Sequence, residues 1–309
     1  MEPGIPQPVD EIVNELAEDD RPLLNSRLTG LSNLSPEDLE VFKHAWEAIA
    51  LERRRQIIHR LVELAEDNIM LNFDTILKHC LEDYDEEVKS QAIEGLWENE
   101  EPSLINPLVN LLEQDGSEKV QETAALALGK FAILAEHKKL RSNHTTTIQD
   151  ALLGAINDKD KPAVVKRRAL EAVAPFSLSQ VRSAITRAYN SHDFQLRVSA
   201  IYAMGRNCDP SWLDILLKEL TSNDTEARYE AVIACGELED ETAVPYLISL
   251  INDADIDVQM AAIQALGKIG GTKARKCLEQ CLDNTSEVIR QTAEQALNEL
   301  TTTDGTLPI

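Results

Sequence analysis

Six basic residues lie in two short runs of this sequence, and together they could form a site for an anion. These residues are Lys138, Lys139, Arg141, Lys166, Arg167 and Arg168. Positive side chains that converge on one point bind carboxylate or phosphate groups through charge-assisted hydrogen bonds. The two runs could therefore accept an acidic partner segment or the chain's own acidic amino-terminal tail. The alternative is a solvated basic face that balances its acidic neighbours.

Residues suited to catalysis or metal binding are otherwise sparse. The five cysteines form no CxxC pair. Cys277 and Cys281 stand one helical turn apart, but Cys281 takes the position that Leu250 has 31 residues earlier, which favours core packing over thiol or metal chemistry. No HExxH motif, glycine-rich phosphate loop or serine-nucleophile elbow occurs. We therefore expect no catalysis, no metal site and no cofactor.

The elements that would position these residues form a repeat. An apolar or small anchor is followed by small or apolar residues four, seven and eight positions later, and this pattern occurs eight times. The anchors are Ile57, Val88, Val120, Val165, Leu196, Ala227, Val258 and Ile289. These offsets fall on one face of an α-helix, and a nearly constant step of 31 residues is typical of stacked units.

Each anchor helix has a predictable start and a partner helix. Six anchors have Asp or Ser three residues earlier, and such side chains cap a helix by accepting a first-turn amide. The cap residues are Asp85, Ser117, Asp193, Asp224, Asp255 and Ser286. A second apolar stripe precedes the cap, as in 213–220 and 244–251. Each unit is therefore predicted to be a helix hairpin, and the hairpins must stack because such short helices are marginal alone.

One unit shows the pattern most fully. Its residues are Ala243, Val244, Pro245, Leu247 and Leu250, followed by Asp253, Asp255, Val258, Ala262, Ala265, Leu266, Gly267, Ile269 and Gly270. They resemble the HEAT-repeat family, specifically its short-period class, the phycobilisome lyase HEAT-like repeats. This resemblance covers roughly residues 36–300. It implies an all-α fold, a right-handed α-α superhelix of about eight helix hairpins.

The resemblance leaves the function open, because the family includes scaffolds, chromophore lyases and hydroxylases. The deoxyhypusine hydroxylases of the family imply His-Glu pairs that hold iron. The residues that follow the six histidines here are Ala45, Arg60, Cys80, Lys138, Thr145 and Asp193. No such pair is present, so the resemblance implies no iron site in this chain. A phycobilin lyase-like activity, or a role as another HEAT-repeat enzyme or accessory subunit, is the alternative to a scaffold.

One step of the repeat is irregular. Val120 and Val165 are 45 residues apart, 14 more than the usual step. Most of the additional residues fall at about 136–149, a polar stretch with two histidines. Loops carry function more often than the elements they join. We expect a plain insertion between two units, and the alternative is an ordered ligand loop over the basic residues.

The helical phase predicts which side chains point away from the buried stripe. Offsets of two, three, six and ten from each anchor should lie on the concave side of the superhelix. An apolar and aromatic set occupies such positions: Val198, Tyr202, Tyr229, Ile233 and Met260. Exposed apolar residues rimmed by charge mark interaction sites. The set is therefore predicted to bind a partner, unless adjacent units cover these side chains.

Charge and hydropathy limit the kind of partner. The formal net charge is −24, and nucleic acid needs an extended basic footprint, so it is a poor partner. No signal peptide and no apolar run of membrane-spanning length is recognisable, and the odd number of cysteines suits reduced thiols. We expect a cytoplasmic monomer whose partner is a protein or peptide, with no nucleic acid and no membrane involved.

The ends of the chain differ from its middle. Residues 1–34 are acidic and contain four prolines, so they are predicted to form a tail and a helical cap. The repeat array should occupy residues 35–300, and residues 301–309 should form a disordered tail. The sequence as a whole predicts a non-catalytic scaffold or adaptor that binds a protein or peptide on the concave face.

Overall fold

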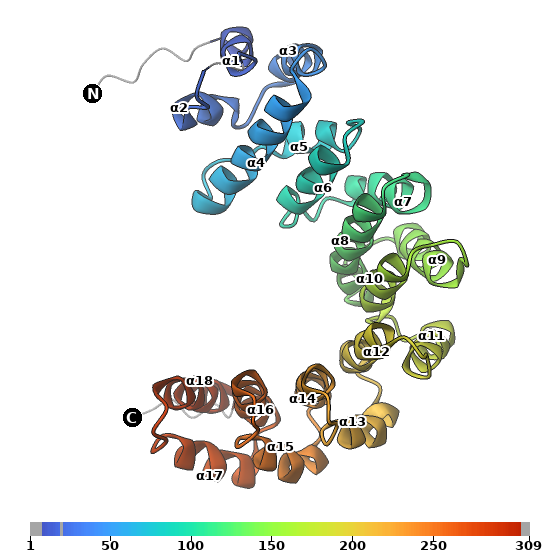
Figure 1. Ribbon diagram of the computed structural model, residues 1–309, viewed down its shortest axis with the longest axis vertical. Helices are drawn as coiled ribbons and strands as arrows, with labels where there is room; N and C mark the ends of the chain where they lie inside the picture. The colour runs from blue at the N-terminus through green and yellow to red at the C-terminus, as the bar shows by residue number, and fades with distance from the viewer. Residues whose placement is uncertain (1–7, 19–20, 304–309) are drawn as a thin grey trace. The chain divides into compact units, whose positions relative to one another are not determined.

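The computed structural model describes residues 8–18 and 21–303 of the chain (Figure 1). All regular secondary structure in these residues is helical, which confirms the predicted all-α fold. The chain divides into two compact units, residues 1–155 and 156–309. The division falls within helix α9 (Ser142–Asn157), close to the irregular step of the repeat.

The first unit begins with short helices and continues with three helix hairpins. Its helices are α1 (Val9–Leu16), α2 (Asn25–Leu28), α3 (Pro36–Trp46), α4 (Leu51–Asp67), α5 (Asp74–Cys80), α6 (Glu86–Gly95), α7 (Ile105–Gln114) and α8 (Glu118–Glu136). Helix α4 packs on α6, and α6 packs on α8. The second helices of successive hairpins thus form one layer.

The second unit repeats this arrangement. Its helices after α9 are α10 (Ala163–Val173), α11 (Ser179–Tyr189), α12 (Phe194–Asn207), α13 (Leu213–Glu219), α14 (Thr225–Leu238), α15 (Val244–Leu250), α16 (Ile256–Ile269), α17 (Gly271–Cys281) and α18 (Glu287–Thr303). Figure 1 shows α12, α14, α16 and α18 side by side in one layer, with α11, α13, α15 and α17 in the other. The former, together with α10, is called the second-helix layer below.

The helices of the second-helix layer approach one another closely because glycine lies at their contacts. A Cβ atom at Gly205 would lie 2.6 Å from Cα of Ala234 on the next helix. At Gly267 a Cβ atom would lie 2.8 Å from Cβ of Ala296. Gly236 has the same position in α14. These glycines lie two residues before the last residue of their helices, where they allow close packing.

Side-chain caps begin the second helices where the sequence predicts them. Five predicted caps accept backbone amides of the first turn: Asp85, Ser117, Asp193, Asp224 and Asp255. A further residue two positions before the cap holds the cap's own amide, as when Asp253 accepts from Asp255 N at 3.0 Å. Arg228 of the preceding hairpin donates to both oxygens of Asp253 at 2.9 Å. The hairpin loop is thereby fixed to its neighbour.

The polar insertion predicted at about 136–149 is mostly helical. Only residues 137–141 join α8 to α9, and the remaining additional residues lengthen the two helices. The threonine hydroxyls donate to carbonyl groups four residues earlier, for example from Thr146 to Ser142 at 3.1 Å. Ile148 and Leu152 are buried on the same helix. The predicted insertion therefore consists mainly of helix, because internal hydrogen bonds satisfy the hydroxyl groups of its threonines.

The amino-terminal helices pack on the first hairpin. Buried Arg53 of α4 donates from Nε to the Leu16 carbonyl at 2.6 Å and from Nη2 to the Arg21 carbonyl at 2.8 Å. The first of these bonds satisfies a carbonyl group at the carboxyl end of α1, and the second holds the segment that follows it. At the other end of the chain, α18 continues to Thr303, so 301–303 are helical and not part of a tail. The remaining residues predicted to form tails, 1–7 and 304–309, lie outside the described residues.

Candidate protein-binding face

The predicted partner-binding residues lie on α12, α14 and α16 of the second-helix layer. Tyr202, Tyr229, Ile233 and Met260 are partly exposed. Val198 is only 5% exposed, so the prediction that it lies open on the surface is wrong. The glycine contacts bring neighbouring helices close together. These helices then cover much of the surface of the predicted partner-binding side chains.

A row of charged side chains borders the partly exposed residues. Arg206 of α12 pairs with Glu237 of α14 at 3.4 Å, and Glu237 pairs with Lys268 of α16 at 2.6 Å. All three lie at offset ten of successive repeats, so they follow the apolar positions across the layer. On the opposite side of the face, Gln195 donates to Glu226 at 3.0 Å. The apolar set is thus rimmed by polar groups, as interaction sites commonly are.

The predicted basic residues are not brought together as one group of free charges. Arg167 donates from Nε to Ser199 Oγ at 3.1 Å, and this hydroxyl donates to Glu171 Oε1 at 2.6 Å. Arg168 pairs with Glu171 at 2.9 Å. Both arginines are partly buried. They form a polar network between α10 and α12, and their role in binding an anion stays a prediction.

The other four basic residues lie at the ends of helices. Lys166 of α10 donates to the Lys159 carbonyl at 3.2 Å. Lys138, Lys139 and Arg141 are exposed between α8 and α9. Lys138 has a φ of 59°, in the left-handed region, as the chain turns after α8. The six predicted anion-binding residues are therefore divided equally between the two units.

Glu230 of α14 is the least satisfied polar group of this face. Its Oε2 atom is buried and has no hydrogen-bond donor in the part of the chain that the structure describes. Burial, together with the charges of Glu171 and Glu226, raises the pKa of Glu230 to about 7. Glu230 is not among the predicted site residues, because its offset of three indicates only the face and not the burial of its carboxyl group.

Comparison with known proteins identifies the repeat. A family model described as HEAT repeats matches residues 73–142 and 213–298, which together make up half of the chain. The chain belongs to the HEAT-repeat family. The predicted HEAT-like architecture of stacked helix hairpins is thereby confirmed.

Three solved structures illustrate the similarity of this HEAT-repeat chain. The CpcE–CpcF complex of phycocyanin lyase from Nostoc sp. PCC7120 is 16% identical over 92% of this chain and 99% of that one, with a TM-score of 0.50. Human deoxyhypusine hydroxylase is 18% identical over 96% and 97%, with a TM-score of 0.33. An engineered protein is 20% identical over 95% and 88%, with a TM-score of 0.42. At 16% identity the similarity to the phycocyanin lyase complex concerns the fold alone. No curated protein sequence matches the chain.

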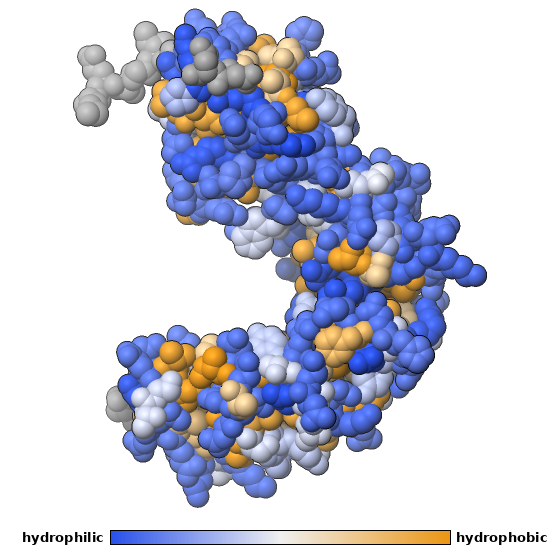
Figure 2. Space-filling view, in the orientation of Figure 1, coloured by the Kyte–Doolittle hydropathy of each residue, from blue (hydrophilic) through white to orange (hydrophobic). Residues whose placement is uncertain are grey.

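Within residues 8–18 and 21–303, no group of three or more His, Cys, Asp or Glu side chains is arranged to hold a metal ion. Among the same residues, none of the helices has the length and apolar character needed to span a bilayer. Figure 2 shows a mostly hydrophilic surface on which apolar residues form separate patches. The second-helix layer combines partly exposed aromatic side chains with a buried acceptor, Oε2 of Glu230, that has no donor among the described residues.

Proposed function

We propose that this HEAT-repeat protein is a scaffold that binds a protein or peptide on the second-helix layer of its second unit, without catalysis of its own. The observation that carries the proposal is the buried, unpaired Oε2 of Glu230, which lies on the same face as Tyr202 and Tyr229. A buried acceptor without a donor costs about 1–3 kcal/mol. A polypeptide that donates one N–H to Glu230 would remove this cost.

The aromatic side chains would supply the rest of the binding energy. Tyr202 and Tyr229 are partly buried, and burial raises the pKa of Tyr202. Side chains already held in place lose little conformational entropy when a ligand covers them. Aromatic residues of this kind often dominate the energy of an interface. The partner segment should therefore place apolar side chains against the tyrosines and an N–H group against Glu230.

The test is a comparison of two double variants. Tyr202→Ala with Tyr229→Ala removes both aromatic side chains from the face. Tyr246→Ala with Leu282→Ala removes two exposed apolar side chains that lie outside the second-helix layer. The partner is first identified by capture from the source organism, and its affinity for each purified variant is then measured by calorimetry. We expect at least about tenfold weaker binding for the tyrosine variant alone.

Unchanged affinity of a folded tyrosine variant would contradict the proposal. A phycobilin lyase-like activity remains the alternative, and covalent attachment of a bilin to a phycobiliprotein by the purified chain would establish it. We also propose that the protein is a cytoplasmic monomer. The five cysteines, all of them free thiols, support this location because disulfides are rare in the cytosol.

A further inference from the structure

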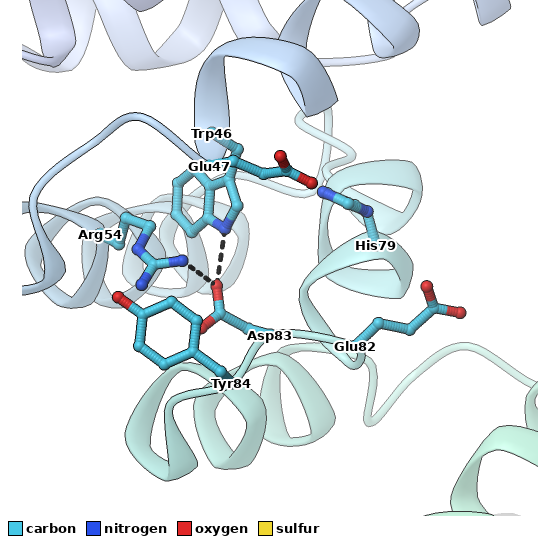
Figure 3. Close-up of a pocket in the computed structure, with 7 residues that line it drawn as sticks. All are labelled: Trp46, Glu47, Arg54, His79, Glu82, Asp83 and Tyr84. Atoms are coloured by element: carbon cyan, nitrogen blue, oxygen red, sulfur yellow. Dashed lines mark hydrogen bonds and ion pairs between the residues drawn. The ribbon is translucent and has the colours of Figure 1, made fainter.

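A pocket of about 310 Å³ lies in the first unit, far along the chain from the tyrosine face. It is formed by the end of α3, by α4 and α5, and by the loop that joins α5 to α6. Its lining residues are Trp46, Glu47, Arg54, His79, Glu82, Asp83 and Tyr84 (Figure 3). None of these belongs to the predicted site residues.

A buried ion pair forms the floor of the pocket. Arg54 Nη1 and Asp83 Oδ2 are 2.7 Å apart, and the two side chains are 3% and 1% exposed. Trp46 Nε1 donates to the same oxygen at 2.8 Å. The other oxygen of Asp83 accepts from the Asp85 amide at 2.9 Å. Both carboxylate oxygens of Asp83 therefore accept hydrogen bonds within the protein, and Asp83 fixes one edge of the Arg54 guanidinium.

The opposite edge of the Arg54 guanidinium has no partner. Its Nε and Nη2 atoms are buried and make no hydrogen bond with any residue that the structure describes. These two donors form the fork that binds planar acceptor groups. The ring of Tyr84 lies 4.3 Å above Cζ of Arg54, and Tyr84 is 74% exposed. Because solvent surrounds most of this tyrosine, it can turn aside and open the donors to a ligand.

Carboxylates occupy the opposite side of the pocket. Figure 3 shows Arg54 and Tyr84 on one side, and Glu47, Glu82 and His79 on the other. Both glutamates are exposed. Burial and the charge of Lys43 lower the pKa of His79, which disfavours the charged form of this imidazole. The rim is therefore negative, which disfavours an anionic ligand and favours a cation.

We propose that this pocket binds a basic peptide segment. A backbone carbonyl group of the segment accepts from Arg54 once Tyr84 has turned aside, and a neighbouring Lys or Arg side chain lies between Glu47 and Glu82. Residues 1–137 carry 30 acidic and 11 basic side chains, so the surrounding charge also attracts such a segment. The site is independent of the face proposed on the second unit and uses different residues.

Nuclear magnetic resonance of the full chain can test the site, because its three tryptophan indole groups give separate signals. The probe is the peptide acetyl-Gly-Arg-Gly-amide, with norleucine and glutamate counterparts as controls. We expect the arginine peptide to shift the Trp46 indole signal in a saturable manner, while the signals of Trp97 and Trp212 stay in place. No shift of Trp46, or an equal shift by the norleucine or glutamate peptide, would overturn the proposal.

Two double variants then distinguish binding in the pocket from general electrostatic attraction to the acidic surface. Glu47→Gln with Glu82→Gln should weaken binding of the arginine peptide at least about fivefold, which corresponds to about 1 kcal/mol. Glu94→Gln with Glu98→Gln removes the same charge from exposed positions near the other end of α6 and should have little effect. Equal weakening by both double variants, or by neither, would show that the pocket does not select the peptide.

Discussion

The two units hold their second helices together in different ways. In the second unit, glycines at offset nine let α12, α14 and α16 contact the next helix almost backbone to backbone. In the first unit, the same offset is occupied by Glu66 in α4 and by Trp97 after α6, and only α8 has a glycine there, Gly129. There the buried pair of Arg54 and Asp83 joins α4 to the α5–α6 loop. Helix α4 is therefore joined to the following hairpin by buried charge, whereas α12, α14 and α16 are joined to their neighbours by close packing at glycine.

The largest expected effect is the loss of the buried carboxylate in the first unit. Asp83→Ala leaves the Arg54 guanidinium and the Trp46 indole without their acceptor. An isolated buried charge of this kind destabilises a protein by about 3–5 kcal/mol. Hydrogen exchange measured by mass spectrometry should show faster exchange in α4 to α6. The control is Glu82→Ala at an exposed neighbouring position. Equal hydrogen-exchange rates of α4 to α6 in both variants would contradict a stabilising role of the buried ion pair.

A smaller loss is expected when close packing is disturbed in the second unit. A methyl group at Gly205 meets the backbone of Ala234, which cannot move as a flexible side chain can. Gly205→Ala should therefore reduce the free energy of unfolding by about 1–3 kcal/mol in urea titrations. Gly154 provides the control, because a methyl group added there would meet nothing from a neighbouring element within 4 Å.

Gly154→Ala should stabilise the chain by about 0.5–1 kcal/mol, because alanine favours a helix more than glycine does. If Gly205→Ala lowers the free energy of unfolding and Gly154→Ala raises it, close contact and not helix propensity determines the role of Gly205. A stabilising Gly205→Ala would show that the second-helix layer has more room than its geometry indicates.

The buried acid of the second unit should make stability depend on pH. The pKa of Glu230 is raised from 4.5 to about 7, so the folded chain binds more protons than the unfolded chain between these values. Its contribution is therefore present below the unfolded pKa and is lost as pH rises through the folded pKa. The free energy of unfolding of Glu230→Gln, relative to that of wild type, should therefore increase by about 2 kcal/mol from about pH 5 to about pH 8, after allowance for partial solvation. If the difference in the free energy of unfolding between the two proteins stays constant across this pH range, the raised pKa of Glu230 is contradicted.

The sequence predicts those features that depend on local spacing. The anchors and caps follow from helical periodicity and from hydrogen bonds within a few residues, and the structure places Asp224 and Asp255 at the helix starts as predicted. The segment 142–149 is harder to predict, because its polar composition hides hydroxyl bonds to the preceding helical turn.

Features that depend on contacts between repeats do not follow from spacing. The burial of Val198 results from the close approach of adjacent helices, which offset two does not reveal. The burial of Arg54 depends on Asp83 of the next hairpin, and the raised pKa of Glu230 depends partly on Glu171, which lies two repeats earlier in the chain. Knowledge of one repeat therefore predicts the architecture, whereas the candidate sites emerge only when neighbouring repeats are stacked.

The most direct test of the proposed scaffold function is site-specific photo-crosslinking of the captured partner. A benzophenone side chain is placed at Gln264, an exposed position of α16 at the same offset as Tyr202, and separately at Tyr246 of α15. The proposal predicts that the partner crosslinks from position 264 and not from position 246. Crosslinking from position 246 alone would place the partner on the other helix layer and contradict the assigned face.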